Sequence, residues 1–365
     1  MKKMRILHFS LTATLGGIET FQRNLFSKIN KDEFEFEFVT TYSDAAVIPS
    51  LEEMGGKIHY LPPQKTIIPY CIKLYKLMKN GNYDAVHIHK NSCANPMVFI
   101  MAKLAGIKKI IAHSHNTSSI NGGIVNAPHY LFRPLVRKIS HTKIACSPEA
   151  AQWLFGKKYV IDNAVPFIKN GIDINKFSYN EETRKQMREE LSFGEELIIG
   201  HIGNFIPQKN HYFMVDIMAE VIKILPDAKL LFIGRGEESK KVLQYAKEKG
   251  TLDNIIFMGS RSDVDKLYQA MDVFLFPSLH EGLPIAGVEA QTAGLLCYFS
   301  DAISKEIILT DNVIQLSLGM SGKEWAEIIA SKSKTFKRQN TSKTIIDAGY
   351  SIDSTAIIME EIYKK

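Results

Sequence analysis

Short apolar runs and amphipathic stretches alternate from the start of the chain. Residues 4–10, "MRILHFS", are an apolar run, and the next segment carries Ile18, Phe21 and Leu25 at helical spacing. Residues 34–40, "FEFEFVT", alternate with a period of two, which is typical of a strand with one wetter face. Further short strands are predicted at 83–89, 107–115 and 141–147. This alternation predicts βαβ units around a parallel sheet.

The pattern breaks at residues 163–180, which are rich in Asn, Pro and Gly, and a charged helical stretch follows. A second series of strands is predicted at 196–203, 228–234, 254–259, 272–278 and 294–300. We therefore predict an α/β fold of two Rossmann-like domains whose parallel sheets face each other across a cleft. The predicted division is an N-terminal domain (1–165), a linker (166–190), a C-terminal domain (191–347) and a final helix (348–365).

Composition narrows the class of protein. The 365 residues suit two domains, and 45% hydrophobic with 23% charged residues is ordinary for a soluble globular protein. A net charge of +6 is too diffuse for a nucleic-acid binder but suits a phosphorylated ligand or an anionic membrane surface. The scattered cysteines suggest neither a zinc site nor a disulfide framework. Since no apolar run approaches about 20 residues and the N-terminal run is better explained as a strand than as a signal peptide, we expect a cytoplasmic protein.

Residues 279–294, "LHEGLPIAGVEAQTAG", carry the most specific pattern in the chain. Glu281 falls in a turn after a buried strand, Pro284 suits a first helical turn, Glu289 lies inside the helix, and Gly294 suits its C-terminal cap. A helix that begins at the ligand edge of a sheet directs free N–H groups at a phosphate. Carboxylates accept hydrogen bonds from sugar hydroxyls, so Glu281 is expected to face a sugar and Glu289 a ribose. Taken alone, the pair is equally compatible with a capping acid and a buried helix glutamate.

Three other motifs sit where strands meet helices. Lys209 lies between a strand and a helix, where it can neutralise a diphosphate, although a solvated surface lysine remains an alternative. Gly16 and Gly17 follow the first strand and let backbone approach a ligand closely, or form a simple tight turn. His113 and His115 end a strand and project to one side, so a zinc site is one interpretation, but no third ligand stands out at a suitable spacing.

A last motif, Asp-x-Asp at 263–265, has a spacing at which two carboxylates bind a divalent metal in some enzymes. Here it opens a helix with apolar Val264, Leu267 and Met271, so an N-terminal cap is the simpler interpretation. No bound metal and no cofactor are expected, because Lys209 and a helix N-terminus can supply the positive potential.

Taken together, these motifs resemble the retaining family-four glycosyltransferases of the two-Rossmann-domain GT-B type, in particular those of bacterial capsule and exopolysaccharide operons. The resemblance extends over nearly the whole chain, through "AHSHNTSS", "KNGIDINKF", "IPQKNH", "FIGRGEE" and "PSLHEGLPIAGVEA". It implies an acceptor-side N-terminal domain, a C-terminal domain that binds a nucleotide sugar, and a final helix that returns to the first domain.

The resemblance also implies roles for individual residues. His115, Lys209 and Glu281 are expected to be catalytic. The expected donor-binding residues are Gly17, Asn204, Lys209, Ser260, Arg261, Glu281, Gly282, Leu283, Pro284, Ile285 and Glu289. Asn204 departs from the family, which has arginine there, and the lost charge is expected to weaken donor affinity or rate about ten- to a hundredfold. Arg235 and Arg261 are candidates to compensate.

The predicted reaction is transfer of a sugar from a nucleotide diphosphate, with UDP expected, to a hydroxyl of a saccharide acceptor, with a lipid-linked oligosaccharide favoured. Basic helical stretches that contain Lys73, Lys76, Arg133 and Arg137 leave open a peripheral contact with the inner face of the cell membrane, against the alternative of solvated helix faces. Two other functions stay open: a nucleotide-sugar-binding partner of another transferase, and a non-hydrolysing sugar epimerase, for which no acid–base set stands out.

Overall fold

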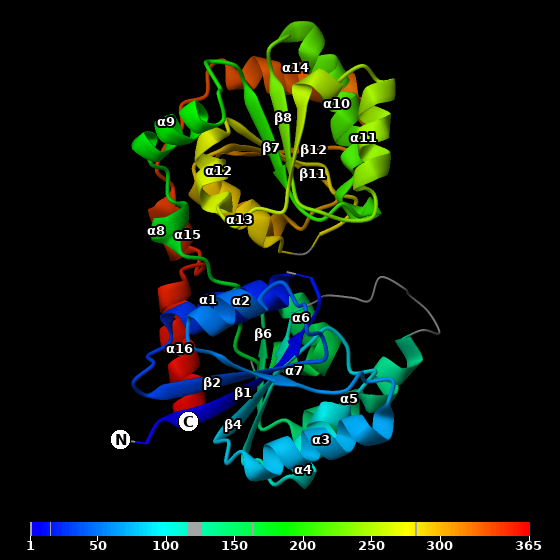
Figure 1. Ribbon diagram of the computed structural model, residues 1–365, viewed down its shortest axis with the longest axis vertical. Coiled ribbons are helices and arrows are strands. Elements are labelled where there is room, and N and C mark those ends of the chain that lie inside the picture. Colours follow the sequence, from blue (N-terminus) through cyan, green and yellow to red (C-terminus); the bar gives the residue numbers. More distant parts are fainter. Residues whose placement is uncertain (1, 15, 116–125, 163, 282) are drawn as a thin grey trace. The chain divides into compact units, whose positions relative to one another are not determined.

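The computed structural model describes residues 2–14, 16–115, 126–162, 164–281 and 283–365. The chain divides into two compact units. Unit 1 comprises residues 1–171 and 351–365, and unit 2 comprises residues 172–350 (Figure 1). The last segment of the chain therefore belongs to the same unit as the first.

Unit 1 is built on a six-stranded sheet in which all strand pairs are parallel. The strand order is β3-β2-β1-β4-β5-β6. The strands are β1 (Met4–Leu11), β2 (Phe34–Thr40), β3 (Lys57–Tyr60), β4 (Ala85–Lys90), β5 (Lys109–Ser114) and β6 (Thr142–Ala145). Apart from the edge strand β3, which is partly exposed, these runs are largely buried on both faces, as expected for a parallel sheet covered by helices.

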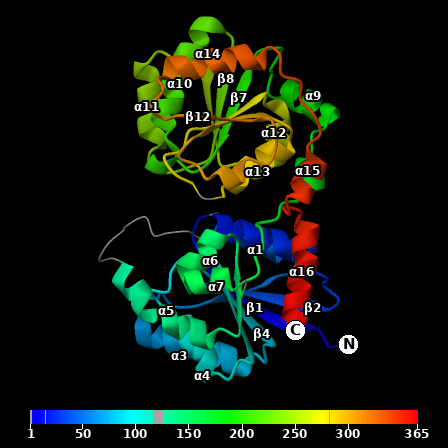
Figure 2. The ribbon, with the colours of Figure 1, turned by 180° about the vertical axis from the view of Figure 1, so that it is seen from behind.

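Helices cover both faces of the unit 1 sheet (Figures 1 and 2). One face packs against α1 (Gly17–Lys28), α2 (Ile48–Glu53) and α16 (Ile352–Lys364), around a core that contains Phe21, Phe36 and Tyr363. The other face packs against α3 (Ile67–Asn80), α4 (Met97–Leu104), α5 (Ala127–Ile139), α6 (Pro148–Phe155) and α7 (Lys157–Ile161). Alternate residues of each strand feed the two cores, because successive side chains point to opposite faces.

Unit 2 repeats the same architecture. Its sheet is also wholly parallel, in the order β12-β11-β10-β7-β8-β9. The strands are β7 (Ile198–Ile202), β8 (Lys229–Ile233), β9 (Ile255–Gly259), β10 (Val273–Phe276), β11 (Leu296–Ser300) and β12 (Val313–Leu316). Both sheets thus confirm the predicted α/β class with parallel strands.

The helices of unit 2 also form two layers. One core packs α10 (His211–Ile224), α11 (Ser239–Glu248) and α14 (Gly322–Ser333) against the sheet. The other packs α8 (Ile174–Phe177), α9 (Glu181–Glu190), α12 (Val264–Ala270), α13 (Ile285–Thr292) and α15 (Ser342–Asp347). Short 3-10 turns occur at η2 (Pro207–Lys209), η3 (Leu252–Asn254) and η4 (Lys305–Ile307). None of the helices in the described ranges combines the length and apolarity of a membrane span.

The strand order of each unit locates its ligand edge. In unit 1 the order reverses between β1 and β4, and in unit 2 it reverses between β7 and β10. Ligands of open parallel sheets bind at the carboxyl ends of the strands beside such a reversal, because the flanking loops diverge there. The loops after β7 and β10 are therefore the first place to look for a site in unit 2. The predicted arrangement of the two sheets across a cleft stays a prediction.

Candidate functional site in unit 2

Lys209 and Glu281 meet at the ligand edge of the unit 2 sheet. Lys209 ends the η2 turn that follows β7, and Glu281 lies in the loop that follows β10. The Lys209 Nζ atom donates to Glu281 Oε1 at 2.6 Å, and the two side chains are 16% and 11% exposed. The strand order brings them together, since β7 and β10 are neighbours although the two residues are far apart in sequence.

Backbone and amide hydrogen bonds join these two loops. Leu279 donates its backbone N–H to the Gln208 carbonyl at 2.8 Å, and Gln208 Nε2 donates to the His280 carbonyl at 2.9 Å. Asn210 Nδ2 donates to the carbonyl oxygen of Pro277 at 3.1 Å. A site carried by two loops that are tied in this way is held in a defined geometry before any ligand binds.

The surroundings of Lys209 favour an anion. An ammonium has three donors, and Glu281 accepts from one of them. Pro284 occupies the N-cap of α13, so the backbone N–H groups of the first turn add a positive pole beside the loop that holds Glu281. Leu283 and Ile285 keep part of their surface exposed there, whereas Gly282 lies outside the described residues.

Glu289 differs from Glu281 in its environment. It is 8% exposed, on the buried side of α13, and its Oε2 accepts a hydrogen bond from the Tyr268 hydroxyl at 3.1 Å. Burial together with the nearby Glu289 carboxylate holds the pKa of Tyr268 well above its usual range, so the phenol stays protonated as a donor. The expected ribose contact of Glu289 remains a prediction.

Ser260 and Arg261, two of the expected donor-binding residues, lie in the loop after β9. Ser260 is exposed, and Arg261 makes two hydrogen bonds to Asp263, at 2.8 and 2.6 Å. Asp263 occupies the N-cap of α12, and Asp265 forms an ion pair with Lys176 at 3.3 Å. Each carboxylate of the Asp-x-Asp motif thus lies beside a cation. The position of Asp263 at the N-cap accords with the helix-start interpretation, although its side chain makes no capping hydrogen bond.

The loops after β7 and β8 approach each other closely at two glycines. A Cβ at Gly234 would overlap the carbonyl oxygen of Gly203, and Gly234 has a φ of +146°, which side-chain-bearing residues rarely adopt. Asn204 follows directly and is partly exposed, and Arg235 on the neighbouring loop is exposed. Arg235 is therefore placed next to the position where the family arginine is missing.

The glycine loop of unit 1 is organised by a residue that the sequence analysis missed. The Glu19 carboxylate accepts hydrogen bonds from the Thr12 N–H at 2.9 Å, the Thr12 hydroxyl at 2.7 Å and the Gly16 N–H at 3.0 Å. Gly17 is the first residue of α1 and is exposed. The signal was present in the sequence, because an acid three residues after a helix start is half of a capping box.

His115 follows the last residue of β5 and is partly buried. Its Nε2 atom lies 2.8 Å from Nδ1 of His89, which is on β4. Burial lowers the pKa of His115 to about 3, so the ring is neutral at physiological pH and offers hydrogen bonds rather than a positive charge. Residues 116–119 of the predicted "AHSHNTSS" loop lie outside the described residues.

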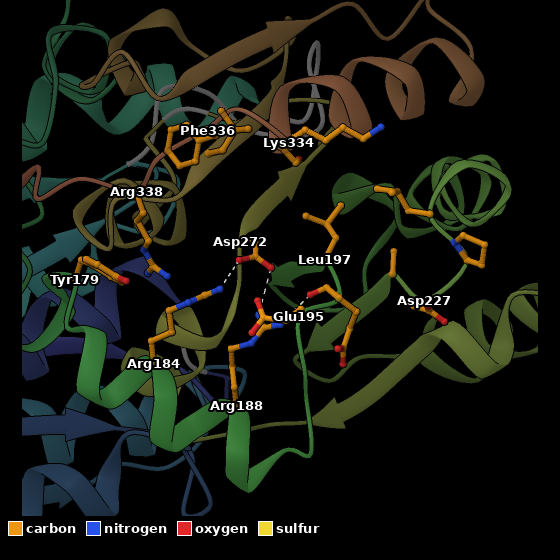
Figure 3. A pocket seen from close by; sticks show the side chains of 16 residues that line it. Tyr179, Arg184, Arg188, Glu195, Leu197, Asp227, Asp272, Lys334, Phe336 and Arg338 are labelled. Carbon is orange, nitrogen blue, oxygen red and sulfur yellow. Dashed lines mark hydrogen bonds and ion pairs between the residues drawn. The ribbon is translucent and has the colours of Figure 1, made fainter.

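A cavity of about 500 Å³ in unit 2 lies at the opposite edge of the sheet (Figure 3). Leu197 and Asp272, which line it, precede β7 and β10, so the cavity opens at the amino ends of the strands. Arg184 and Arg188 hydrogen-bond to Asp272 at 2.6 and 3.3 Å. Arg338 donates to the backbone carbonyls of residues 268, 269, 271 and 293. Arg184 and Arg338 thus donate hydrogen bonds to backbone carbonyls at the C-terminal end of α12 that lack a partner within the helix, which stabilises the fold.

Comparison with known proteins identifies the family. The model "Glycosyltransferase Family 4" matches residues 15–176, and "Glycosyl transferases group 1" matches residues 182–349. The putative glycosyltransferase EpsF of Bacillus subtilis is 30% identical over 98% of this chain and 96% of its own. An Escherichia coli enzyme named UDP-Gal:alpha-D-GlcNAc-diphosphoundecaprenol alpha-1,3-galactosyltransferase is 26% identical over 82% of this chain and 80% of its own.

The crystal structure of Anabaena HepE in complex with UDP and glucose superposes with a TM-score of 0.78 at 19% identity, covering 99% of this chain and all of that one. This similarity bears on the fold alone. The fold is the GT-B architecture, in which each of two α/β units is built on a sheet of parallel strands. From the two family models and the relatives that match almost its full length, the chain belongs to the glycosyltransferases of group 1 and family 4.

Proposed function

We propose that this glycosyltransferase moves a sugar, with retention of anomeric configuration, from a UDP-sugar to a hydroxyl of a lipid-linked oligosaccharide in capsule or exopolysaccharide synthesis. The observation that carries the proposal is the 2.6 Å pair between Lys209 and Glu281 at the reversal point of the unit 2 sheet. One member of the pair suits the leaving diphosphate and the other suits the hydroxyls of the transferred sugar.

The proposed chemistry uses these two groups without an added cation. Lys209 and the N–H groups at the start of α13 stabilise the negative charge that develops on the departing diphosphate. The leaving phosphate oxygen takes the proton of the acceptor hydroxyl as that hydroxyl attacks the same face of the sugar. Glu281 accepts hydrogen bonds from the sugar, and His115, a neutral imidazole, is proposed to hydrogen-bond a substrate hydroxyl.

The substrates are proposed by analogy with the relatives. The E. coli relative is named for a UDP-Gal donor and a diphosphoundecaprenol-linked acceptor, and HepE was crystallised with UDP and glucose. A UDP-sugar donor and a polyprenyl-diphosphate-linked acceptor follow for this chain.

A thermal-shift panel of nucleotide sugars tests the donor, because a ligand that binds only the native state raises its melting temperature. A stabilising UDP-sugar is then incubated with lipid-linked acceptors and released UDP is measured. Release of UDP with formation of a longer glycolipid supports transfer. Asn204, which replaces the family arginine, favours one competing function: a partner protein that binds the nucleotide sugar without transferring it. That function predicts stabilisation without any UDP release.

We also propose that unit 1 contacts the membrane that holds the acceptor. Ile67, Ile68 and Ile72 on α3 are 60%, 72% and 52% exposed, and Leu131 on α5 is 70% exposed. Lys65, Lys73, Lys76, Arg133 and Lys138 lie on or beside the same two helices. Apolar side chains that enter the lipid headgroup region, flanked by cations, are the pattern of a peripheral anchor.

Flotation with vesicles tests the membrane contact. The protein should float with vesicles that contain anionic lipid at low salt, because each basic residue near such a surface contributes about 1 kcal/mol. The double variant Ile68→Glu/Leu131→Glu should no longer float with the vesicles and should bind UDP like the wild type. Absence of binding to anionic vesicles at low ionic strength would remove this part of the proposal.

A further inference from the structure

Histidines gather on one face of the unit 1 sheet. His8 is on β1, His87 and His89 are on β4, His113 is on β5, and His115 follows it directly. In the parallel register His8 pairs with His87 and His89 pairs with His113. Because residues two apart on a strand share a face, all five rings project to the side covered by α1 and α16. Such a set of imidazoles is unusual in a core, where polar groups are costly unless they are engaged.

Three of these rings bring their nitrogens together. His89, His113 and His115 each offer one ring nitrogen, and these atoms lie within 4.8 Å of one another. Within this set, His89 Nδ1 is 2.8 Å from His115 Nε2. His113 Nε2 is buried and has no hydrogen-bond partner in the described part of the chain. A buried nitrogen without a partner indicates a site that is incomplete without a ligand.

In two of the rings the other nitrogen is held from behind by a further histidine. His113 Nδ1 is 3.2 Å from His87 Nε2, and His89 Nε2 is 3.4 Å from His8 Nδ1. The remaining nitrogen of His115, Nδ1, is buried and has no hydrogen-bond partner in the described part of the chain. Histidines that bind metals generally have their second nitrogen fixed by such a partner, which sets the tautomer and the ring orientation.

We propose that His89, His113 and His115 form a three-imidazole site for a transition-metal cation of the Zn²⁺ class. A tetrahedral ion with zinc–nitrogen bonds of about 2.0–2.1 Å places its ligand atoms roughly 3.4 Å apart. The 2.8 Å contact has to open by about half an ångström, and the wider separations have to close by small ring rotations. Three protein ligands leave a fourth position for water or an anion.

The chemistry of the ligand set selects the ion. Imidazole suits Zn²⁺, Cu, Ni and Fe, whereas Mg²⁺ and Ca²⁺ prefer oxygen ligands, and the three ligands proposed here are all nitrogen atoms. Burial lowers the pKa of all three rings, so their nitrogens are unprotonated at neutral pH and available to a metal.

A second set of three rings, His8, His87 and His89, has similar spacing but is less suited. All three residues are fully buried. His87 has both nitrogens engaged, one with the Tyr363 hydroxyl at 2.7 Å and one with His113. His115 is only partly buried, so the first set includes a residue with some exposed surface, whereas the second set has none. The described structure therefore favours the set that includes His115.

The test uses the full-length protein, with any affinity tag removed and after treatment with a chelator. Zn²⁺ is titrated by calorimetry, and Co²⁺ is added separately and followed by its visible absorption, which is intense for tetrahedral coordination. We expect one ion per chain, and a loss of affinity greater than about 100-fold in His113→Asn, since outer partners alone are worth 10–100-fold. His129→Asn is the matched buried-histidine control, because both nitrogens of His129 are engaged, with the Cys93 N–H at 3.0 Å and the Trp153 carbonyl at 3.1 Å, and this variant should bind like the wild type.

Each outcome decides the proposal. Absence of a tetrahedral Co²⁺ spectrum, or unchanged affinity in His113→Asn, would overturn it. Loss in His8→Asn with retention in His115→Asn would assign binding to the second set and would equally overturn it. If His113→Asn fails to fold by circular dichroism, His115→Asn at the edge of the cluster replaces it, and wild-type affinity there refutes the site. These readouts do not depend on sugar transfer, so failure here leaves the proposed function untouched.

Discussion

Replacing Lys209 with methionine removes the ammonium and keeps most of the aliphatic stem over the Phe276 ring, whose centre lies 4.7 Å from Nζ. The variant loses the 2.6 Å bond to Glu281 and the two other donors of the ammonium. Loss of one preorganised donor to a transition-state anion typically lowers kcat by about 100- to 1,000-fold, which corresponds to about 2.7–4 kcal/mol. We expect a loss of that size in sugar transfer.

The same substitution has a separate effect on stability. Glu281 is 11% exposed and would be left without its cation. Removing one partner of a buried hydrogen-bonded pair costs about 2–5 kcal/mol, and the residual exposure of both side chains favours the lower end. A cost on the order of 2 kcal/mol lowers the melting temperature of a unit of this size by about 4–8 °C. Adding Glu281→Gln removes the unpaired charge and should restore part of that loss.

Two measurements separate these effects. UDP release with donor and acceptor gives kcat, and differential scanning calorimetry gives the melting temperature. Lys209→Arg serves as the control that keeps the charge. If Lys209→Met retains full turnover, the lysine does not stabilise the diphosphate. If the double variant regains both stability and turnover, Lys209 acts only as the structural partner of Glu281, and the proposed chemistry is wrong.

Three further predictions concern the nucleotide site and the histidines. Asn204→Arg should tighten UDP binding about ten- to a hundredfold, because a charge-assisted contact adds about 1.5–3 kcal/mol; equal affinities in calorimetry would show that position 204 does not face the diphosphate. The free energy of unfolding should keep its neutral-pH value down to about pH 6.5 and decrease at lower pH. Burial lowers the pKa of His8 and of His115 to about 3, so between about pH 6.5 and pH 3 these two histidines take up protons only in the unfolded chain. Each ring contributes about 1.4 kcal/mol per pH unit in this window, so urea unfolding of His8→Asn should show a shallower pH dependence, and an identical slope would contradict the assignment. Gly234→Ala should lower the urea midpoint, since the new Cβ overlaps the Gly203 carbonyl at a φ of +146°; wild-type stability would mean that the two loops can relax apart.

Much of the fold could be predicted from local pattern. The apolar runs at 4–10 and 272–278 became β1 and β10, and the Pro-Ile start of α13 was visible in its sequence. Such runs are distinctive because a strand buried on both faces is apolar along most of its length. Glu289 was harder, since its position in the helix could not reveal that Tyr268 would engage its carboxylate.

The pairings within the candidate sites could not be predicted in the same way. Lys209 and Glu281 were each expected at the ligand edge, but their direct contact depends on β7 and β10 being adjacent, which is set by strand order. The third histidine near His113 and His115 was missed for a similar reason. His89 lies 24 positions before His113 and reaches it only through the register of β4 against β5. Local sequence carries no signal for either.

The two-segment composition of unit 1 has a consequence for biosynthesis. Met359 and Tyr363 of α16 are buried beside Phe36 in a core that otherwise forms from the first part of the chain. The ribosome makes all of residues 172–350 before it makes this helix, so throughout that interval one face of the nascent unit 1 sheet is covered by α1 and α2 but not by α16. Chains usually fold domain by domain from the N-terminus. Here unit 1 can complete its core only after unit 2 has been synthesised, so the part of the chain that is made first waits longest for its last helix.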